Sequence, residues 1–127
     1  MIYYDVIYAT EGYMRDGGYL AGMLRVLILS ELSRAEGYGY GIARALSERS
    51  RGDLRVRPES LYPVLHRMEQ EGLITAHWEQ SAAGRPRKLY VLTAKGRRRW
   101  ERSRKAFIAQ SRGALKAIGA MPAPGEP

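Results

Sequence analysis

Basic side chains are concentrated in one part of this 127-residue chain. The stretch from Arg85 to Lys105 holds ten lysines and arginines and a single acid, Glu101. All of the net charge of +8 comes from this stretch, and the rest of the chain is close to neutral. A local excess of positive charge is typical of a surface that binds a polyanion, if the fold directs these side chains together. A merely solvated helix face is the alternative.

Other kinds of chemistry find little support in the residue types. The absence of cysteine excludes disulfides, thiolate metal sites and a cysteine nucleophile. The two histidines, His66 and His77, have no carboxylates gathered around them that would complete a metal site. No nucleophile, base and orienting residue fall at a workable spacing, so we expect neither an enzyme nor a cofactor. Without an apolar run of about eighteen residues or an export signal, we expect a cytoplasmic protein that does not contact membranes.

The elements that position the basic residues follow from the spacing of apolar side chains. Apolar residues three and four apart predict helices over 19–35, 39–50 and 58–72. The third helix starts at Pro58, which suits a first helical position, and stops at Gly72, a typical C-terminal residue. Three short helices joined by tight turns are typical of a helix-turn-helix.

A change of period after Gly72 predicts two strands and then a fourth helix. Ile74, Ala76 and Trp78 alternate with polar residues, as in a half-buried strand over 74–79. A basic loop too rich in glycine and proline to be regular leads to a second strand over 88–92, which completes a wing. Thr93 is placed to cap a final helix that runs to about Ile118.

The predicted fold class is therefore mostly α with a small β-hairpin: a winged helix-turn-helix followed by a long C-terminal helix. The predicted parts are a tyrosine-rich extension (1–18), the winged helix-turn-helix domain (19–93), the C-terminal helix (94–119) and a disordered tail (120–127). Because so much aromatic surface is unfavourable in water, we expect the extension to pack on the body or on a partner chain.

Short motifs over about residues 20–107 carry a family resemblance. In order, they are Tyr38-Gly39-Tyr40-Gly41-Ile42, Ser60-Leu61-Tyr62-Pro63, Leu65, Arg67-Met68-Glu69, Glu71-Gly72-Leu73-Ile74, Trp78, Gly84-Arg85-Pro86-Arg87-Lys88-Leu89-Tyr90 and Leu92-Thr93-Ala94-Lys95-Gly96. This set resembles the PadR family of bacterial and archaeal transcriptional regulators. The resemblance implies a winged helix with its third helix in the major groove, its wing at the minor groove, and a dimer made largely by the last helix. It thus implies that residues 19–93 are a DNA-binding domain and that residues 94–119 are a dimerisation helix. The family usually has glycine and threonine where this chain has Glu59-Ser60, so the third helix starts with an acid.

The predicted DNA contacts lie at the starts of the second and third helices and in the wing. Hydroxyls near a helix N-terminus can meet phosphates, and basic side chains can reach phosphates, base edges or a narrow minor groove. These residues are Tyr38, Tyr40, Ser60, Tyr62, Pro63, His66, Arg67, Arg85, Arg87 and Lys88. Tyr62 could instead be a core aromatic that joins the third helix to the first. Gly39 and Gly41 lack the preceding strand and following lysine of a nucleotide-binding loop.

The last helix carries an apolar stripe that suits a modest dimer interface. Its members are Trp100, Phe107, Ile108, Leu115 and Ile118. In family members that bind planar drugs or phenolics, an aromatic of the last helix lines a pore between subunits, and its distance from Gly96 makes Phe107 the matching residue. Trp100 lies seven residues earlier, about two turns, and so on nearly the same face. The two aromatics either line a pocket for a small aromatic effector or are simply dimer core.

These observations predict a sequence-specific, homodimeric repressor that binds an inverted-repeat operator in double-stranded DNA and is released by a small aromatic effector. One alternative is a basic protein that binds RNA or DNA without sequence preference. It would expose aromatic side chains for stacking on single strands, whereas the aromatics here are predicted at core positions. Another is a signalling adaptor that uses the winged helix for protein contacts, and the basic wing argues against it.

Overall fold

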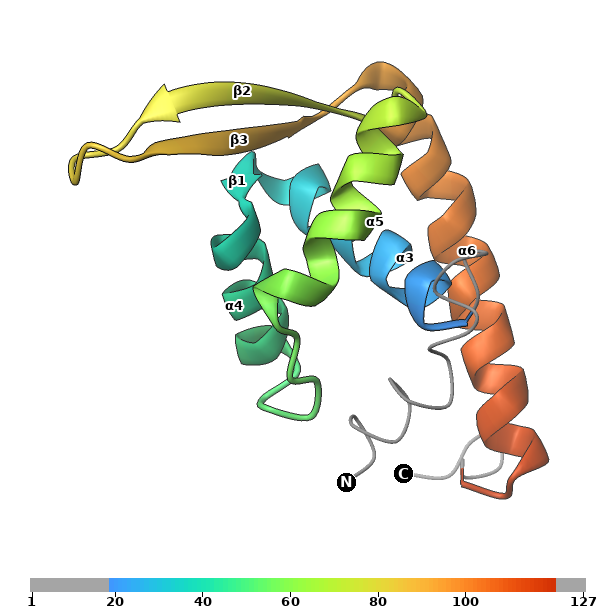
Figure 1. Cartoon of the computed structure of the whole chain (residues 1–127). Coiled ribbons are helices and arrows are strands. Elements are labelled where there is room, and N and C mark those ends of the chain that lie inside the picture. Colours follow the sequence, from blue (N-terminus) through green and yellow to red (C-terminus); the bar gives the residue numbers. More distant parts are fainter. Residues whose placement is uncertain (1–18, 121–127) are drawn as a thin grey trace.

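The computed structural model describes residues 19–120, in which four helices surround a small sheet (Figure 1). In chain order these are α3 (Tyr19–Arg34), β1 (Gly37–Tyr38), α4 (Gly39–Arg49), α5 (Pro58–Gln70), β2 (Ile74–Gln80), β3 (Pro86–Leu92) and α6 (Ala94–Ala117). The four predicted helices and two predicted strands are all present, with bounds that agree to within two residues. The tyrosine-rich extension and residues 121–127 of the predicted tail lie outside the described residues.

One hydrophobic core joins α3, α4, α5 and the base of the β2–β3 hairpin. Its most deeply buried side chains are Leu24, Ile28 and Leu29 of α3, Leu61, Leu65 and Met68 of α5, and Leu73 and Ile74 at the start of the hairpin. The α3 and α5 members recur at the three-four spacing of an amphipathic helix, so burying them fixes which face of α5 turns outward. Glu31 of α3 is also buried, where Arg49 of α4 donates a hydrogen bond to its carboxylate and Arg34 pairs with it at 3.3 Å.

The sheet has three antiparallel strands in the order β1-β3-β2, rather than the two of the predicted hairpin. The additional strand, β1, is only two residues long and pairs Gly37 with Tyr90 and Tyr38 with Leu89. It places the start of α4 directly beside the wing. The turn between the strands is held by two hydrogen bonds, in which the Ser81 amide donates to the Arg85 carbonyl and the Arg85 amide donates to the Ser81 hydroxyl. The strand β3 begins at Pro86, two residues earlier than predicted.

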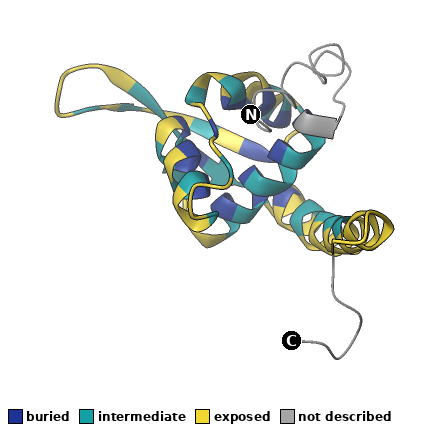
Figure 2. Ribbon diagram, turned by 90° about the horizontal axis from the view of Figure 1, so that it is seen from below, coloured by how far each residue is buried: buried dark blue, intermediate teal, exposed yellow. Residues whose placement is uncertain are grey.

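The hairpin projects past the helices (Figure 1), and this overturns one prediction about its side chains. Ile74 and Ala76 are buried and half-buried, as the alternation predicts, but Trp78 on the same face is 68% exposed. No helix extends far enough to cover it. Figure 2 shows that the hairpin tip and the distal half of α6 carry almost no buried residues.

The helix α6 begins in close contact with the connection between α5 and β2. Thr93 caps it as predicted: the Thr93 hydroxyl accepts a hydrogen bond from the Gly96 amide at 3.0 Å and lies 2.7 Å from the Gly72 carbonyl, to which it can donate. Gly96 is buried against Leu73. From this anchored end α6 runs along α3 and continues beyond the body. Among the described helices, none combines the length and apolar character needed to cross a membrane.

Candidate nucleic-acid interface

The helix α5 presents a stripe of exposed side chains opposite its buried face. The exposed residues recur every three or four positions and are Glu59, Tyr62, Pro63, His66 and Gln70. The buried residues Leu61, Val64, Leu65 and Met68 lie on the other side. An α-helix with one free face along its length fits the major groove of B-DNA, which is about 12 Å wide. The packing of α5 therefore leaves the stripe accessible to a duplex.

The stripe borders a hollow of about 420 Å³ that lies between α5, the start of α4 and the underside of the hairpin. Six of the ten predicted DNA contacts line it: Tyr38, Tyr40, Tyr62, His66, Arg87 and Lys88. Tyr62 and Tyr40 are 47% and 55% exposed, so the alternative that Tyr62 is a core aromatic is wrong. The prediction that the aromatics occupy core positions is wrong for both tyrosines and for Trp78, which also lines the hollow.

Arg87 is held against the body of the protein rather than extended into solvent. Its guanidinium lies 4.0 Å from the centre of the Tyr38 ring, and the Tyr38 hydroxyl donates a hydrogen bond to Glu79 of β2. This hydrogen bond to the carboxylate raises the pKa of Tyr38 above its ordinary value. Tyr38 also stacks on Tyr40, with ring centres 6.3 Å apart. These contacts fix the wing against the start of α4.

Lys88, the next residue along β3, ties the wing to α5 instead. Its Nζ lies 3.6 Å from the Glu69 carboxylate and 5.3 Å from the centre of the Trp78 ring. Arg87 and Lys88 therefore hold the hairpin through two different contacts, one to Tyr38 at the start of α4 and one to Glu69 of α5. Two of the three predicted wing contacts thus also position the wing, while Arg85 lies exposed at its tip.

The tip itself is a compact turn that presents Arg85. The Arg85 amide donates to the Ser81 hydroxyl at 3.1 Å, and the Gln80 side chain donates to the Gly84 carbonyl at 2.6 Å. Gly84 has a φ of +84°, a left-handed conformation that favours glycine at this position. The arginine is therefore carried by an ordered loop.

Three predicted contacts lie outside the hollow on α5. Ser60 is half-buried in the first turn, where its amide donates to the Arg57 carbonyl at 3.0 Å. Pro63 and Arg67 border a separate shallow depression beside α3. Sequence reasoning missed Trp78 and Glu69 as members of the hollow. The exposed position of Trp78 follows only from the length of the hairpin relative to the helices.

Comparison with known proteins identifies the family to which the chain belongs. The family described as "Transcriptional regulator PadR-like family" matches residues 28–102, which include α4, α5, the wing and the start of α6. The chain belongs to the PadR-like family. Its members are DNA-binding transcriptional regulators and not enzymes, which confirms both the resemblance and the expectation that no catalysis takes place.

Individual relatives support the assignment to the PadR-like family. The chain is 34% identical over 92 residues to the transcriptional regulator Rv3488 of Mycobacterium tuberculosis, covering 72% of this chain and 82% of that protein. It is 29% identical over 100 residues to the transcriptional regulator YqjI of Escherichia coli, covering 78% of this chain but 46% of that protein, so it spans about half of YqjI. A crystal structure of a PadR-like regulator from Bacillus cereus has 29% identity and a TM-score of 0.63, covering 80% of this chain and 97% of that chain.

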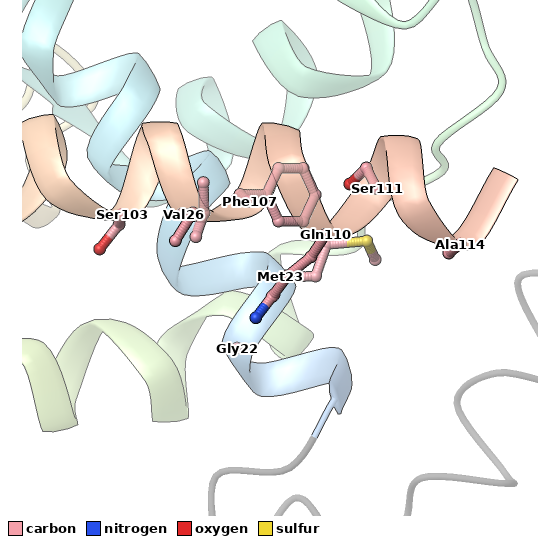
Figure 3. Close-up of a pocket in the computed structure, with 9 residues that line it drawn as sticks. Gly22, Met23, Val26, Ser103, Phe107, Gln110, Ser111 and Ala114 are labelled. Carbon is pink, nitrogen blue, oxygen red and sulfur yellow. The ribbon is translucent and has the colours of Figure 1, made fainter. Parts of the chain in front are cut away.

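The last helix of this PadR-like chain divides its apolar residues between two faces. Phe107 points toward α3 and lines a second hollow of about 360 Å³ with Met23 and Val26 (Figure 3). Trp100 is half-buried against the hydrophobic core and does not line this hollow. Ile108, Leu115 and Ile118 are exposed on the single chain. The structure therefore brings together only part of the predicted stripe.

An ion pair links α3, which lines this second hollow, to the C-terminal end of α5. Arg25 donates to both carboxylate oxygens of Glu71, with one donor–acceptor distance of 3.1 Å, and Lys95 of α6 donates to the Glu71 carbonyl at 2.7 Å. The Arg25 guanidinium lowers the pKa of the Glu71 carboxyl, which is partly exposed. Three helices therefore meet at the residue that ends α5.

Proposed function

We propose that this PadR-like regulator is a homodimeric repressor that binds an inverted-repeat operator in double-stranded DNA and is released by a small aromatic effector. The observation that carries the proposal is the exposed stripe of α5 beside an ordered wing that ends in Arg85. A helix in the major groove supplies base contacts, and a basic wing tip supplies phosphate or minor-groove contacts.

The proposed dimer interface is the distal part of α6. Ile108 and Leu115 are seven residues apart and so lie on one face of the helix, and Ile118 follows one turn later. Large apolar side chains on one exposed face favour association with a second apolar surface. Two-fold pairing would place two copies of α5 about one helical turn of DNA apart, which suits two half-sites of an inverted repeat.

The proposed effector site is the hollow between α3 and α6. Phe107 supplies a flat aromatic wall, Met23 and Val26 supply apolar contacts, and Gln110 and Ser111 supply polar groups that could orient a ligand (Figure 3). Such a combination is typical of small-molecule sites. Because Arg25 lies between Met23 and Val26 in sequence and pairs with Glu71, a ligand that shifts α3 would also disturb the end of α5.

The test is a fluorescence-anisotropy titration at about 0.15 M salt with the duplex upstream of the protein's own gene. A shuffled duplex of the same composition is the control. A specific regulator should bind the first at least about 1,000-fold more tightly. Flat aromatic compounds should then lower the anisotropy with wild type but not with Phe107→Ala. Equal binding to both duplexes would refute the specific-operator proposal.

A second candidate function is binding of single-stranded nucleic acid, favoured by the exposure of Trp78, Tyr40 and Tyr62 in one basic hollow. Bases stack on exposed aromatic side chains with little sequence preference. A Trp100→Phe variant would leave Trp78 as the only tryptophan reporter. Saturable quenching by single strands, with tighter binding than to any duplex, would favour this function over the first.

A further inference from the structure

The exposed stripe of α5 starts with an acidic residue, although the chain carries a net charge of +8. Glu59 is the second residue of α5, is exposed, and lies one turn before Tyr62 on the same face. In a helix-turn-helix the N-terminal residues of the recognition helix are the ones that contact base edges. Glu59 therefore lies among the residues that, in this motif, are next to base edges.

The carboxylate of Glu59 is available for an external donor. No hydrogen bond or ion pair of Glu59 is found within residues 19–120, whereas most other acids there have a partner. Glu31 is bound by Arg49, Glu48 by Arg44, Glu69 by Lys88, Glu71 by Arg25 and Glu79 by Tyr38.

An unneutralised carboxylate next to DNA opposes binding to phosphates, because phosphate contacts provide most of the sequence-independent affinity. It has one kind of favourable partner in the major groove: an exocyclic amine. Carboxylates accept from cytosine N4. Adenine also has an amine, N6, but its neighbouring N7 is an acceptor that repels a carboxylate, and guanine presents only acceptors at this edge. An acid at this position therefore weakens binding to all sequences except those that offer the right amine.

We propose that Glu59 determines operator specificity by accepting a hydrogen bond from the N4 amine of one cytosine in each half-site. This assignment rests on the proposed function, in which α5 lies in the major groove. Glu59 also lowers affinity for non-operator DNA, so its charge widens the difference between specific and random sites.

The experiment is selection of binding sites from a random duplex library, followed by titration of the selected duplex and its single-base variants. Wild type should select a consensus with cytosine at one position of each half-site. Replacing that cytosine should weaken wild-type binding by roughly 5- to 100-fold. Glu59→Gln should select adenine there, because a glutamine amide pairs with adenine N6 and N7. Glu59→Ala should lose the preference at that position and bind random DNA more tightly.

The matched control is Glu101→Gln, which removes the same charge from an exposed position of α6. In Figure 1, α4 and α6 lie on opposite sides of α5. Glu101→Gln should select the wild-type consensus. If Glu59→Gln and Glu59→Ala also select that consensus with unchanged discrimination, Glu59 is only a helix-terminal charge and the assignment is refuted. If wild type selects no consensus at all, the proposed function itself fails. Circular dichroism of each variant should show the same overall helical content as wild type.

Discussion

Gly96 lies in the first turn of α6, pressed against the backbone that connects α5 to β2. A Cβ atom added there would lie 2.0 Å from the Leu73 carbonyl oxygen and 2.7 Å from a methyl group of Leu92. Since real Cβ contacts are essentially never shorter than 3.0 Å, α6 and the connection would have to separate by about 1 Å. The Leu73 oxygen cannot turn aside freely, because it accepts a hydrogen bond from the Thr93 amide at 3.1 Å and the Thr93 hydroxyl lies 3.0 Å from it.

Two opposing effects decide the outcome of Gly96→Ala. Alanine in place of glycine within a helix stabilises it by about 0.5–1 kcal/mol. Overpacking costs about 1–3 kcal/mol, and each strained hydrogen bond adds about 0.5–1.5 kcal/mol. The variant should therefore lose roughly 2–4 kcal/mol of unfolding free energy, a fall in Tm of about 8–16 °C for a chain of this size.

The control is Gly113→Ala on the same helix, where an added Cβ meets nothing within 4 Å. It should gain about 0.5–1 kcal/mol. Thermal unfolding followed by circular dichroism, at one protein concentration because association shifts Tm, measures both variants. A Tm that rises in Gly96→Ala as it does in Gly113→Ala would show that α6 is not seated as described.

Three further predictions concern the wing, the ion pair at the end of α5, and the dimer. Arg85→Ala should weaken binding to operator and random DNA equally and lower the slope of log K against log salt concentration by about 1. Arg87→Ala should lower this slope less, because the Arg87 guanidinium lies over the Tyr38 ring. The same slope for both variants would contradict this. Because the folded-state pKa of Glu71 is lowered, its carboxylate stabilises the fold above its ordinary pKa of 4.5, and this contribution is lost as the pH falls through the lowered value. Glu71→Gln should therefore lower the free energy of unfolding, measured by urea titration at pH 7, by up to about 1 kcal/mol, as expected for a partly exposed ion pair. A difference in stability between wild type and variant that is unchanged at low pH would contradict this. Leu115→Lys should be monomeric by light scattering, with unchanged helical content. A variant that is still dimeric would show that the interface does not lie on this part of α6.

Much of the fold could be predicted because local signals coincide with the tertiary structure. The apolar spacing of α5 identifies both its buried face and its exposed stripe, and Pro58 marks its first residue. Thr93 was predicted as a cap from its type and position, and its hydroxyl does accept from the Gly96 amide. These features could be predicted because they depend on residues that are close together in the sequence.

The features that could not be predicted depend on residues far apart in the chain. The strand β1 is two residues long, and its pairing with β3 spans about fifty residues, so Gly37 and Tyr38 carry no strand period. Alternation along β2 gives the face of Trp78 but not whether a helix reaches far enough to cover it. In the site, the basic residues of the wing could be predicted from their residue types. The partners of Arg87 and Lys88 could not, because Tyr38 and Glu69 lie on other elements far away in the sequence.

The helix α5 assigns stability and recognition to different side chains. Leu61, Val64, Leu65 and Met68 serve the core, while Glu59, Tyr62, His66 and Gln70 face outward at interleaved positions. Substitutions at the outward positions leave no cavity, and surface changes away from special features usually alter stability by less than about 0.5 kcal/mol. After gene duplication, one copy could thus acquire a new operator through a few mutations without passing through an unstable intermediate. The same separation makes these four positions a compact set for a library in which altered operator preference is selected.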